Sequence, residues 1–314
     1  MKDLRIVFMG TPHFAVATLD ALIKAKINVV GVVTAPDKPA GRGQKMQQSA
    51  VKKYALDHNL TVLQPSNLKS EEFLDQLKNL NGNLQIVVAF RMLPKAVWQL
   101  PEYGTFNLHA SFLPNYRGAA PINWAIINGE RKTGVSTFFI DEKIDTGNII
   151  LQEEVVIGDD ETLGELHDKL MEVGSRLVVN TVQLIEKGTV KTVKQSEIEE
   201  KPAPKIFTET CKINWNDTLS NTYNLIRGLN PYPAAWTTLI NNDDEIKVKI
   251  YDVKKESASH QQTPGTIITT KNEIKVAVNG GYIILESLQL AGKKQMDSKS
   301  LLNGFRFHKN AHMQ

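Results

Sequence analysis

Short apolar segments alternate with helix-like segments through the first 187 residues of the chain. Strands are predicted at Leu4–Met9, Ile27–Val33, Leu84–Phe90, Thr105–Leu108, Thr133–Ile140 and Ile149–Val156. Helices are predicted between and after them, at Phe14–Lys26, Ser49–Asn59, Ser70–Asn79, Pro121–Ile127 and Thr162–Lys187. Because buried strands that alternate with helices build parallel sheets covered on both faces, this pattern predicts an α/β fold with a doubly wound parallel sheet.

The pattern changes after Gly188. Residues 189–205 are rich in charge, contain two prolines and have little apolar periodicity, which is typical of a linker. One helix and five closely spaced strands are then predicted, at Thr218–Leu229, Ala235–Leu239, Ile246–Val253, Gly265–Thr270, Glu273–Val278 and Gly281–Leu290. The sequence Asn279-Gly280-Gly281 is a hairpin signal. We therefore expect a first domain at 1–188, a linker at 189–205 and a small β-barrel at 206–314.

The composition limits the class of protein. Hydrophobic residues make up 41% of the 314 residues and charged residues 23%, so the chain can bury a proper core. The longest apolar runs are far shorter than the ~18 residues that a membrane span needs, and the run that follows Arg5 is too short for a signal peptide. Cys211 is the single cysteine, which excludes an internal disulfide and a cysteine-based metal cage. A cytoplasmic protein is expected.

The net charge of +3 is unevenly distributed. One basic cluster, with Lys38, Arg42, Lys45, Lys52 and Lys53, lies between Asp37 and Lys53. A second runs from Lys293 to the end of the chain and contains Lys293, Lys294, Lys299, Arg306 and Lys309. Two interpretations stay open: two solvated loops, or two surfaces that bind a polyanion.

The carboxyl ends of the strands are where open parallel sheets bind their ligands. Gly10-Thr11-Pro12 follows the first strand but lacks the other glycines of a dinucleotide fingerprint, and no Walker-type phosphate loop occurs in the sequence. Binding of a nicotinamide cofactor or of ATP is therefore not expected. Gly10-Thr11-Pro12 is interpreted as the turn that enters a helix.

Asn107 and His109 lie at the end of the fourth predicted strand, Thr105–Leu108, and Asp145 lies in the loop "DEKIDTGNII" after the next one. Side chains two residues apart on a strand point to the same side. An amide, an imidazole and a carboxylate could serve as oxyanion donor, proton acceptor and orienting group, although an Asn-x-His pair alone is as often structural. No serine nucleophile elbow occurs and Cys211 has no suitable context, which favours direct transfer to an external nucleophile. The spacing of Asp, His and Glu shows no metal-ligand set.

Four longer segments carry a family resemblance: "FMGTPHFAVATLDAL", "APDKPAGRG", "NLHASFLPNYRGAAPINWAIINGERKTGVSTFFIDEKIDTGNII" and "IRGLNPYPAAW". Together they resemble the 10-formyltetrahydrofolate-dependent formyltransferases, and among these the methionyl-tRNA formyltransferases, over nearly the whole chain. The Pro-Ala-Gly-Arg-Gly loop and the C-terminal part narrow the resemblance to the tRNA enzymes. It implies a Rossmann-like catalytic domain and a C-terminal OB-like β-barrel that binds tRNA.

The resemblance also implies roles for individual residues. Asn107, His109 and Asp145 match the catalytic triplet of the family. Ser111, Phe112, Leu113 and Pro114 match its folate-binding Ser-Leu-Leu-Pro, with Phe112 in place of leucine. Arg42, flanked by Lys38 and Lys45, matches the basic loop that meets the acceptor end of the tRNA. The segment Ala89–Pro94, "AFRMLP", carries Arg91 where the family usually has glycine, at the expected wall of the pterin pocket.

The expected activity is transfer of a formyl group from 10-formyltetrahydrofolate to the amino group of initiator methionyl-tRNA, without a metal and by a monomer. The sequence leaves open whether His109 or Asp145 takes the amine proton. Two alternatives remain. A formyltransferase for a small amine, such as glycinamide ribonucleotide or an amino sugar, would not need the Ala35–Met46 loop together with a barrel. A non-catalytic RNA-binding protein would not need the Asn-His-Asp set.

Overall fold

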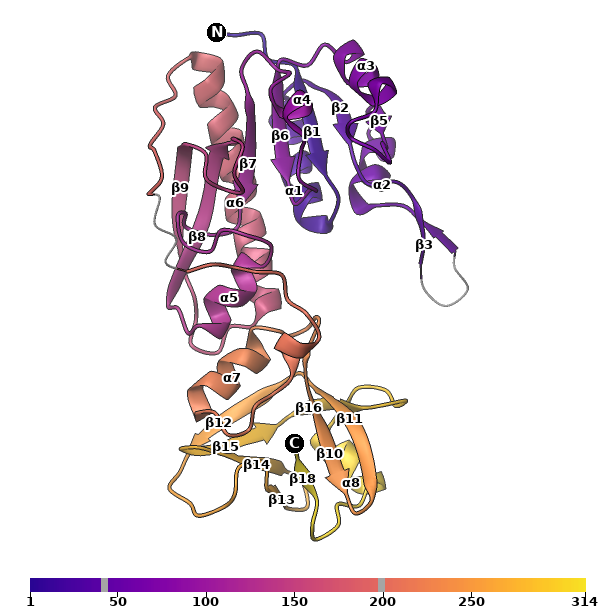
Figure 1. Ribbon diagram of the computed structural model, residues 1–314, viewed down its shortest axis with the longest axis vertical. Coiled ribbons are helices and arrows are strands. Elements are labelled where there is room, and N and C mark those ends of the chain that lie inside the picture. Colours follow the sequence, from indigo (N-terminus) through magenta and orange to yellow (C-terminus); the bar gives the residue numbers. More distant parts are fainter. Residues whose placement is uncertain (41–44, 197–200) are drawn as a thin grey trace. The chain divides into compact units, whose positions relative to one another are not determined.

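The computed structural model describes residues 1–40, 45–196 and 201–314 (Figure 1). Backbone contacts divide these residues into two compact units that interleave in the sequence. Unit 1 comprises Met1–Gly118, Gly134–Val155 and Asp168–Pro202, and unit 2 comprises Ala119–Thr133, Val156–His167 and Ala203–Gln314. Two segments that the sequence placed in a first domain of 1–188, namely Ala119–Thr133 and Val156–His167, therefore have their contacts in unit 2.

A seven-stranded sheet is the centre of unit 1, with the strand order β5-β2-β1-β6-β7-β8-β9. Strands β5, β2, β1, β6 and β7 are mutually parallel, whereas β8 runs antiparallel to β7. The bounds are β1 Ile6–Gly10, β2 Val29–Val33, β5 Val62–Leu63, β6 Leu84–Val88, β7 Thr105–His109, β8 Lys132–Phe139 and β9 Ile149–Val156.

The predicted α/β class with a mostly parallel sheet is confirmed, and β8 is the strand that runs antiparallel to its neighbour. Strand β8 begins beyond the carboxyl end of β7, because His109 pairs with Ser136 and Phe106 with Phe139. The segment between the two strands does not return to the amino edge of the sheet, as a parallel connection requires. Its helix, α5 (Pro121–Ile127), is therefore not a crossover helix.

Helices cover both faces of this sheet (Figure 1). On one face, α1 (His13–Lys24) meets α6 (Leu163–Lys187) where Thr18 Oγ1 lies 3.4 Å from Ser175 Oγ. On the other face, α3 (Glu71–Asn79) and α4 (Lys95–Trp98) pack on side chains of β1 and β6 in one buried cluster. Val87 belongs to this cluster and pairs in register with Asn107, so Asn107 and His109 belong to the α3 and α4 face.

Local sequence signals explain where the helices of unit 1 begin. Ser49 precedes α2 (Ala50–Asp57) and accepts a hydrogen bond from the Lys52 backbone N–H at 3.0 Å. Ser70 does the same for α3, which also has two acidic residues in its first turn. Such caps satisfy backbone N–H groups that the helix leaves unpaired. The predicted bounds of these helices agree with the structure to within about two residues.

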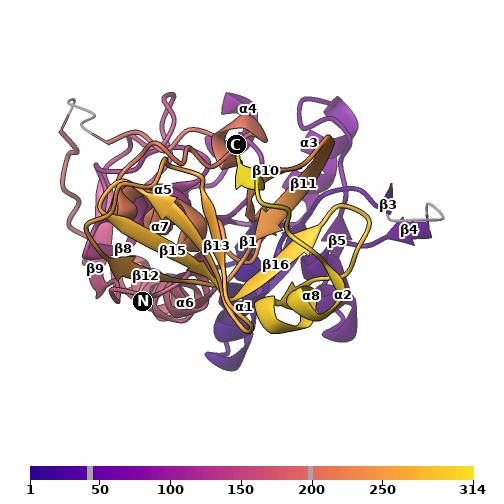
Figure 2. The same cartoon turned by 90° about the horizontal axis from the view of Figure 1, so that it is seen from below.

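Unit 2 contains two antiparallel sheets, seen in orange and yellow in Figure 2. The five-stranded sheet has the order β17-β16-β11-β10-β18 and the four-stranded sheet the order β12-β15-β14-β13. Its elements are η1 Glu209–Cys211, α7 Leu219–Arg227, β10 Ala235–Asn241, β11 Asp244–Ile250, β12 Val253–Ser257, β13 Ile267–Thr269, β14 Ile274–Val278, β15 Gly281–Leu285, β16 Ser287–Leu290, β17 Met296–Asp297, α8 Ser298–Gly304 and β18 His312–Met313. A small OB-like β-barrel was predicted for this part, and the structure shows an antiparallel β domain built of two sheets.

Two strands predicted as continuous are each divided between the sheets. The Ile246–Val253 prediction splits into β11 and β12, and the Gly281–Leu290 prediction splits into β15 and β16. Both breaks occur at one corner, where the Asp252 carbonyl accepts the N–H groups of Glu286 (2.8 Å) and Ser287 (3.0 Å). Strands that change sheets at a shared corner close two sheets around one core.

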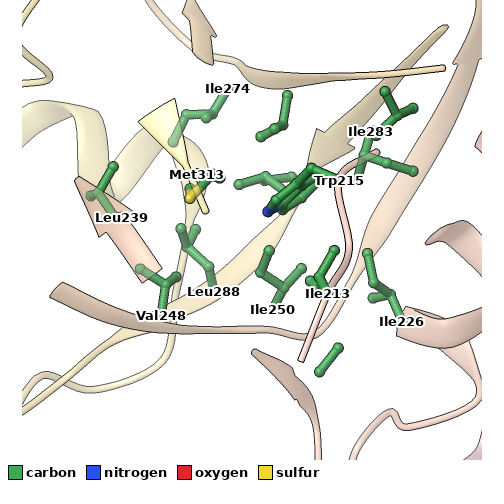
Figure 3. Packing of buried hydrophobic residues seen from close by; sticks show 14 of the residues in the cluster. Ile213, Trp215, Ile226, Leu239, Val248, Ile250, Ile274, Ile283, Leu288 and Met313 are labelled. Atoms are coloured by element: carbon green, nitrogen blue, oxygen red, sulfur yellow. The ribbon is translucent and has the colours of Figure 1, made fainter. Parts of the chain in front are cut away.

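The core of unit 2 is a single cluster of apolar side chains (Figure 3). Strand β10 contributes to it by strict alternation, with every second residue buried. Trp215 is 3% exposed, and its indole N–H donates to Thr237 Oγ1 at 2.8 Å, so its one polar group is satisfied inside the core. Each fully buried aliphatic side chain contributes about 1.5–3 kcal/mol. In the described part of the chain, no helix is long and apolar enough to cross a membrane.

Candidate active site

The site begins at the carboxyl end of β7. Asn107 pairs with Val87 of β6 and Phe138 of β8, so it sits between two strands and cannot shift in register. His109 ends the strand and is 7% exposed. The side chains of Asn107 and His109 lie on the same side of the sheet, as their spacing predicts.

The two nitrogens of His109 have different surroundings. Nε2 lies 2.8 Å from the backbone oxygen of Tyr116, and Nδ1 lies 3.8 Å from Oδ2 of Asp145. A carbonyl oxygen only accepts, so Nε2 carries a proton and Nδ1 is the nitrogen whose protonation can change. At 3.8 Å, the contact with Asp145 is too long for a hydrogen bond and becomes an ion pair when Nδ1 is protonated.

Asp145 reaches His109 from a turn with an unusual backbone. Its φ is +56°, in the left-handed region, which Asp tolerates better than most residues. Its Oδ2 accepts a hydrogen bond from the Gly118 N–H at 3.0 Å. Two residues on, a side chain at Gly147 would place its Cβ 1.6 Å from the carbonyl oxygen of Phe139, so only glycine fits there. The Asp-Thr-Gly sequence is thus needed for the shape of the turn as well as for its carboxylate.

Asn107 has an available amide. Its side chain is half-buried, and within the described ranges 1–40, 45–196 and 201–314 it forms no hydrogen bond. An amide that points from a rigid strand and has no partner in the protein can donate to a group on a bound molecule.

Two buried residues that sequence reasoning missed support the Asp145 turn. The Gln195 amide donates to the carbonyl oxygens of Asp145 (3.0 Å) and Gly147 (2.7 Å). The Arg117 guanidinium donates to Gln195 Oε1 from Nε (3.1 Å) and Nη2 (2.8 Å). Arg117 lies in the segment "NLHASFLPNYRGAAP…" that carries the family resemblance, which was a signal that could have been used. Gln195 lies in the segment interpreted as a linker, where no local pattern marks it.

The expected folate-binding segment Ser111–Pro114 follows directly. Ser111 and Leu113 are buried, whereas Phe112 is 41% exposed. Ser111 Oγ donates to the Asn115 carbonyl at 2.7 Å, which ties the segment to itself. Ser136 accepts from the Leu113 N–H (3.1 Å) and donates to the Ser111 carbonyl (2.7 Å). The buried side chains therefore fix the backbone, and Phe112 is the most exposed side chain of this segment, whereas Pro114 is half-buried.

The Ala35–Met46 loop is a two-stranded ribbon that the sequence did not predict, with β3 at Lys38–Ala40 and β4 at Lys45–Gln47. Lys38 is exposed and begins β3, and Lys45 begins β4. Arg42 lies outside the described residues. Prolines and glycines in this segment favoured an irregular loop, because both weaken strand pairing.

The base of the ribbon is anchored by Asp37. Its carboxylate accepts hydrogen bonds from Lys52 Nζ at 2.6 Å and from the Gln64 amide at 2.8 Å. The bonds from Lys52 and Gln64 lower the pKa of the Asp37 carboxyl. The carboxylate is thus kept in its charged, hydrogen-bonded form, and it ties the ribbon to α2 and to the segment after β5.

Arg91, the residue at the expected glycine, is exposed and is not among the residues with a positive φ. The left-handed conformation in this loop belongs to Ala89, whose φ is +46°. The Arg91 guanidinium donates to the carbonyl oxygens of Pro65 and, at 3.0 Å, of Ser66. Arginine is therefore accommodated without backbone strain, and it joins the loop after β6 to the loop after β5.

Two sequence profiles of a known protein family match this chain. The profile described as "Formyl transferase" matches residues 4–182, and the profile described as "Formyl transferase, C-terminal domain" matches residues 205–306. The chain belongs to the formyl transferase family.

Relatives of this formyl transferase match along its whole length. Methionyl-tRNA formyltransferase of Flavobacterium johnsoniae is 58% identical over 99% of both chains. That of Flavobacterium psychrophilum is 60% identical over 98% of both chains, and that of Bacteroides fragilis is 54% identical over 97% of this chain and 96% of its own.

Solved structures of similar fold are more distant in sequence. The sugar 3N-formyl transferase WlaRD, crystallised with dTDP and 5-N-formyl-tetrahydrofolate, has a TM-score of 0.66 at 23% identity over 94% of this chain and 100% of its own. HypX from Aquifex aeolicus, in complex with tetrahydrofolic acid, has a TM-score of 0.66 at 16% identity over 96% of this chain and 47% of its own. These structures support the shared fold. Across the described ranges of this formyl transferase, no group of three or more His, Cys, Asp or Glu residues could hold a metal ion.

Proposed function

We propose that the chain transfers a formyl group from 10-formyltetrahydrofolate to the free amino group of initiator methionyl-tRNA. The observation that carries the proposal is 58–60% identity to methionyl-tRNA formyltransferases over nearly the full length of both proteins. Methionyl-tRNA as the acceptor comes from the names of these relatives. The folate donor is supported by distant relatives of the same fold that were solved with tetrahydrofolic acid or folinic acid.

The reaction makes and breaks one bond to the formyl carbon. The amine of the methionyl group attacks this carbon, its oxygen becomes an oxyanion, and the bond from carbon to the folate nitrogen breaks. One proton leaves the amine and one is needed on the departing folate nitrogen, so a single group can move the proton between them. We assign the oxyanion to Asn107, whose amide has no hydrogen-bond partner in the described part of the chain.

His109 and Asp145 form the proton-handling pair in this proposal. Nδ1 of His109 faces the Asp145 carboxylate at 3.8 Å, and both side chains are largely buried. The Nε2 hydrogen bond to the Tyr116 carbonyl fixes the orientation of the ring, and the carboxylate lies where it can balance the charge of an imidazole that takes a proton. Either His109 or Asp145 can take the amine proton, directly or through water, and the proposal holds for both. Ser111–Pro114 is the proposed folate-binding segment, with Phe112 as its exposed side chain.

The proposal also assigns a role to each domain. The two family profiles end and begin at residues 182 and 205, which supports a catalytic domain of 1–188 and a tRNA-binding domain of 206–314. The five basic residues of the second cluster, Lys293, Lys294, Lys299, Arg306 and Lys309, are all exposed in unit 2. A monomer and a cytoplasmic location, where charged tRNA is used, remain part of the proposal.

A panel of acceptors tests this function. Purified protein and 10-formyltetrahydrofolate are incubated with methionyl-tRNA, glycinamide ribonucleotide or a nucleotide-linked amino sugar, and formylated product is measured. Methionyl-tRNA should be the preferred acceptor by at least about a hundredfold in kcat/KM. Preference for a small amine would replace the proposal with the small-amine alternative.

Arg42 is expected to determine how the tRNA acceptor end is bound. Arg42→Ala should strongly reduce the rate with methionyl-tRNA. Arg42→Lys should reduce it substantially, since lysine keeps the charge but loses the planar fork. Binding of free 10-formyltetrahydrofolate should change little. Wild-type activity in Arg42→Ala would refute this role, and loss of folate binding would move Arg42 to the donor pocket.

The basic residues of unit 2 are expected to bind tRNA phosphates. Affinity should fall with salt, with a logarithmic slope of about −0.7 to −0.9 for each neutralised phosphate. A K293A/K294A/K299A variant should therefore have a shallower slope, by up to about 2–3, in filter-binding measurements over a salt series. Lys24→Ala with Lys78→Ala, two exposed lysines of unit 1, is the control. An unchanged slope in the triple variant would contradict this surface.

A further inference from the structure

We infer that Gln195 and Arg117 are positioning residues for the catalytic carboxylate: they hold the Asp145 turn in the conformation that presents this carboxylate to His109. The inference rests on the proposed role of Asp145. It assigns a function to the segment after α6, which the sequence pattern describes only as a linker.

Gln195 contacts the Asp145 turn from a segment that is distant in the sequence. Its amide nitrogen donates to the carbonyl oxygens of Asp145 at 3.0 Å and of Gly147 at 2.7 Å. The side chain is 6% exposed, so water does not compete for these bonds. The two carbonyls lie on either side of Thr146. One buried amide therefore fixes the backbone at both ends of the Asp-Thr-Gly turn.

Arg117 determines which way this amide points. Its guanidinium nitrogens Nε and Nη2 both donate to Gln195 Oε1, and Nη2 also donates to the Ser196 carbonyl at 2.9 Å. A guanidinium group cannot accept a hydrogen bond, so the glutamine oxygen must face Arg117 and its NH₂ group must face the turn. Arg117 is itself 7% exposed, which makes this pair a buried and oriented unit.

The turn needs such support. Asp145 has a φ of +56°, a region that is unfavourable for residues with a Cβ atom. Its carboxylate makes two further contacts, with the Gly118 N–H at 3.0 Å and with His109 Nδ1 at 3.8 Å. Relaxation of the backbone towards a more favourable φ would swing the carboxylate away from both. A displacement of about 1 Å in a catalytic group can reduce a rate by about a hundredfold.

Gln195→Glu separates positioning from packing. Glutamate has the same size and still accepts from Arg117, now as a charged pair, so the buried contact survives. It has no amide protons, so it cannot donate to the two carbonyls and instead repels them. We expect kcat for formyl transfer to methionyl-tRNA to fall about a hundredfold, with the KM values for both substrates within about twofold of wild type. Gln195→Met, which removes the donors without adding charge, should give a smaller fall in the same direction.

Asn83→Asp is the matched control. Asn83 is also buried, accepts from the Arg5 N–H at 2.7 Å and donates to the Asp3 carbonyl at 2.7 Å. It directly precedes β6, so it lies at the amino ends of the parallel strands, whereas Asn107 and His109 lie at a carboxyl end. This variant should lose stability in thermal unfolding and keep its kcat. A purely structural role for Gln195 predicts the same behaviour for both variants.

A double-mutant cycle tests whether Gln195 acts through Asp145. In an Asp145→Asn background, Gln195→Glu should lower kcat by no more than about twofold, because the group that it positions is already lost. Full additivity of the two effects would overturn the inference. So would kcat values within about threefold of wild type in folded Gln195→Glu and Gln195→Met. Absence of transfer by the wild-type protein would instead refute the proposed function, so the two failures are distinguishable.

Discussion

Replacement of His109 by alanine is expected to lower kcat with methionyl-tRNA by about 10²–10⁴-fold, the usual effect of removing a general acid–base group. Asp145→Ala should have an effect of the same order, since it removes the charge that faces Nδ1. The reason is geometric: one imidazole nitrogen is engaged by the Tyr116 carbonyl, and the other faces the carboxylate. In the proposed role, Nδ1 and the carboxylate that faces it are the groups that exchange the amine proton.

We do not expect reduced folding stability to account for these falls in kcat. His109→Ala removes one neutral hydrogen bond, which contributes about 1 kcal/mol. Steady-state kinetics and urea unfolding should be measured on the same preparations. His58→Ala is the control, because His58 lies at the end of α2, stacks on Tyr54 and is outside the site. If either His109→Ala or Asp145→Ala, correctly folded, kept more than about a tenth of the wild-type rate, its assigned role would be wrong.

Replacement of Asn107 by alanine is expected to lower kcat by about 10²–10³-fold, as for other oxyanion donors. Because this amide has no hydrogen-bond partner in the described part of the chain, its removal leaves no buried group unpaired. Stability should thus be nearly unchanged, and KM for both substrates should stay within a few-fold of wild type.

Asn107→Asp makes this prediction more specific. Aspartate has a similar shape but places a negative charge where the oxyanion forms, so its kcat should be at least as low as that of Asn107→Ala. Single-turnover formyl transfer measured above pH 7, where the new carboxyl is ionised, gives the comparison. Activity of Asn107→Asp close to wild type would show that no oxyanion develops beside this residue.

The sequence predicts elements best where a local signal marks them. Serine caps and apolar periodicity place α2 and α3 correctly, and Asn279-Gly280-Gly281 joins β14 to β15 in the expected hairpin. Strand direction is not local: β8 is buried over most of its length, as parallel strands are, yet it pairs antiparallel with β7. The corner at Asp252 and Glu286 was likewise not predicted, because no glycine or proline stands beside either residue to mark a break.

In the candidate site, too, some residues are marked by a local sequence pattern and others are not. Asn107 and His109 could be paired from the period of a strand, and Asp145 from the resemblance of its loop to a known family. Gln195 could not be found, since its partners are two backbone carbonyls far away in sequence. Arg91 stands where the family usually has glycine, and only the structure shows that the left-handed residue of this loop is Ala89. Contacts between distant segments thus decide what local patterns leave undetermined.

Formylation of initiator and elongator methionyl-tRNA can be compared in one assay. The purified protein is given saturating 10-formyltetrahydrofolate with initiator or elongator methionyl-tRNA, and the initial rate of formyl-methionyl-tRNA formation is measured for each. The account predicts rapid formylation of the initiator, much slower formylation of the elongator, and loss of both reactions in Asn107→Ala and His109→Ala. Formylation of neither tRNA, or undiminished formylation in these two variants, would contradict it.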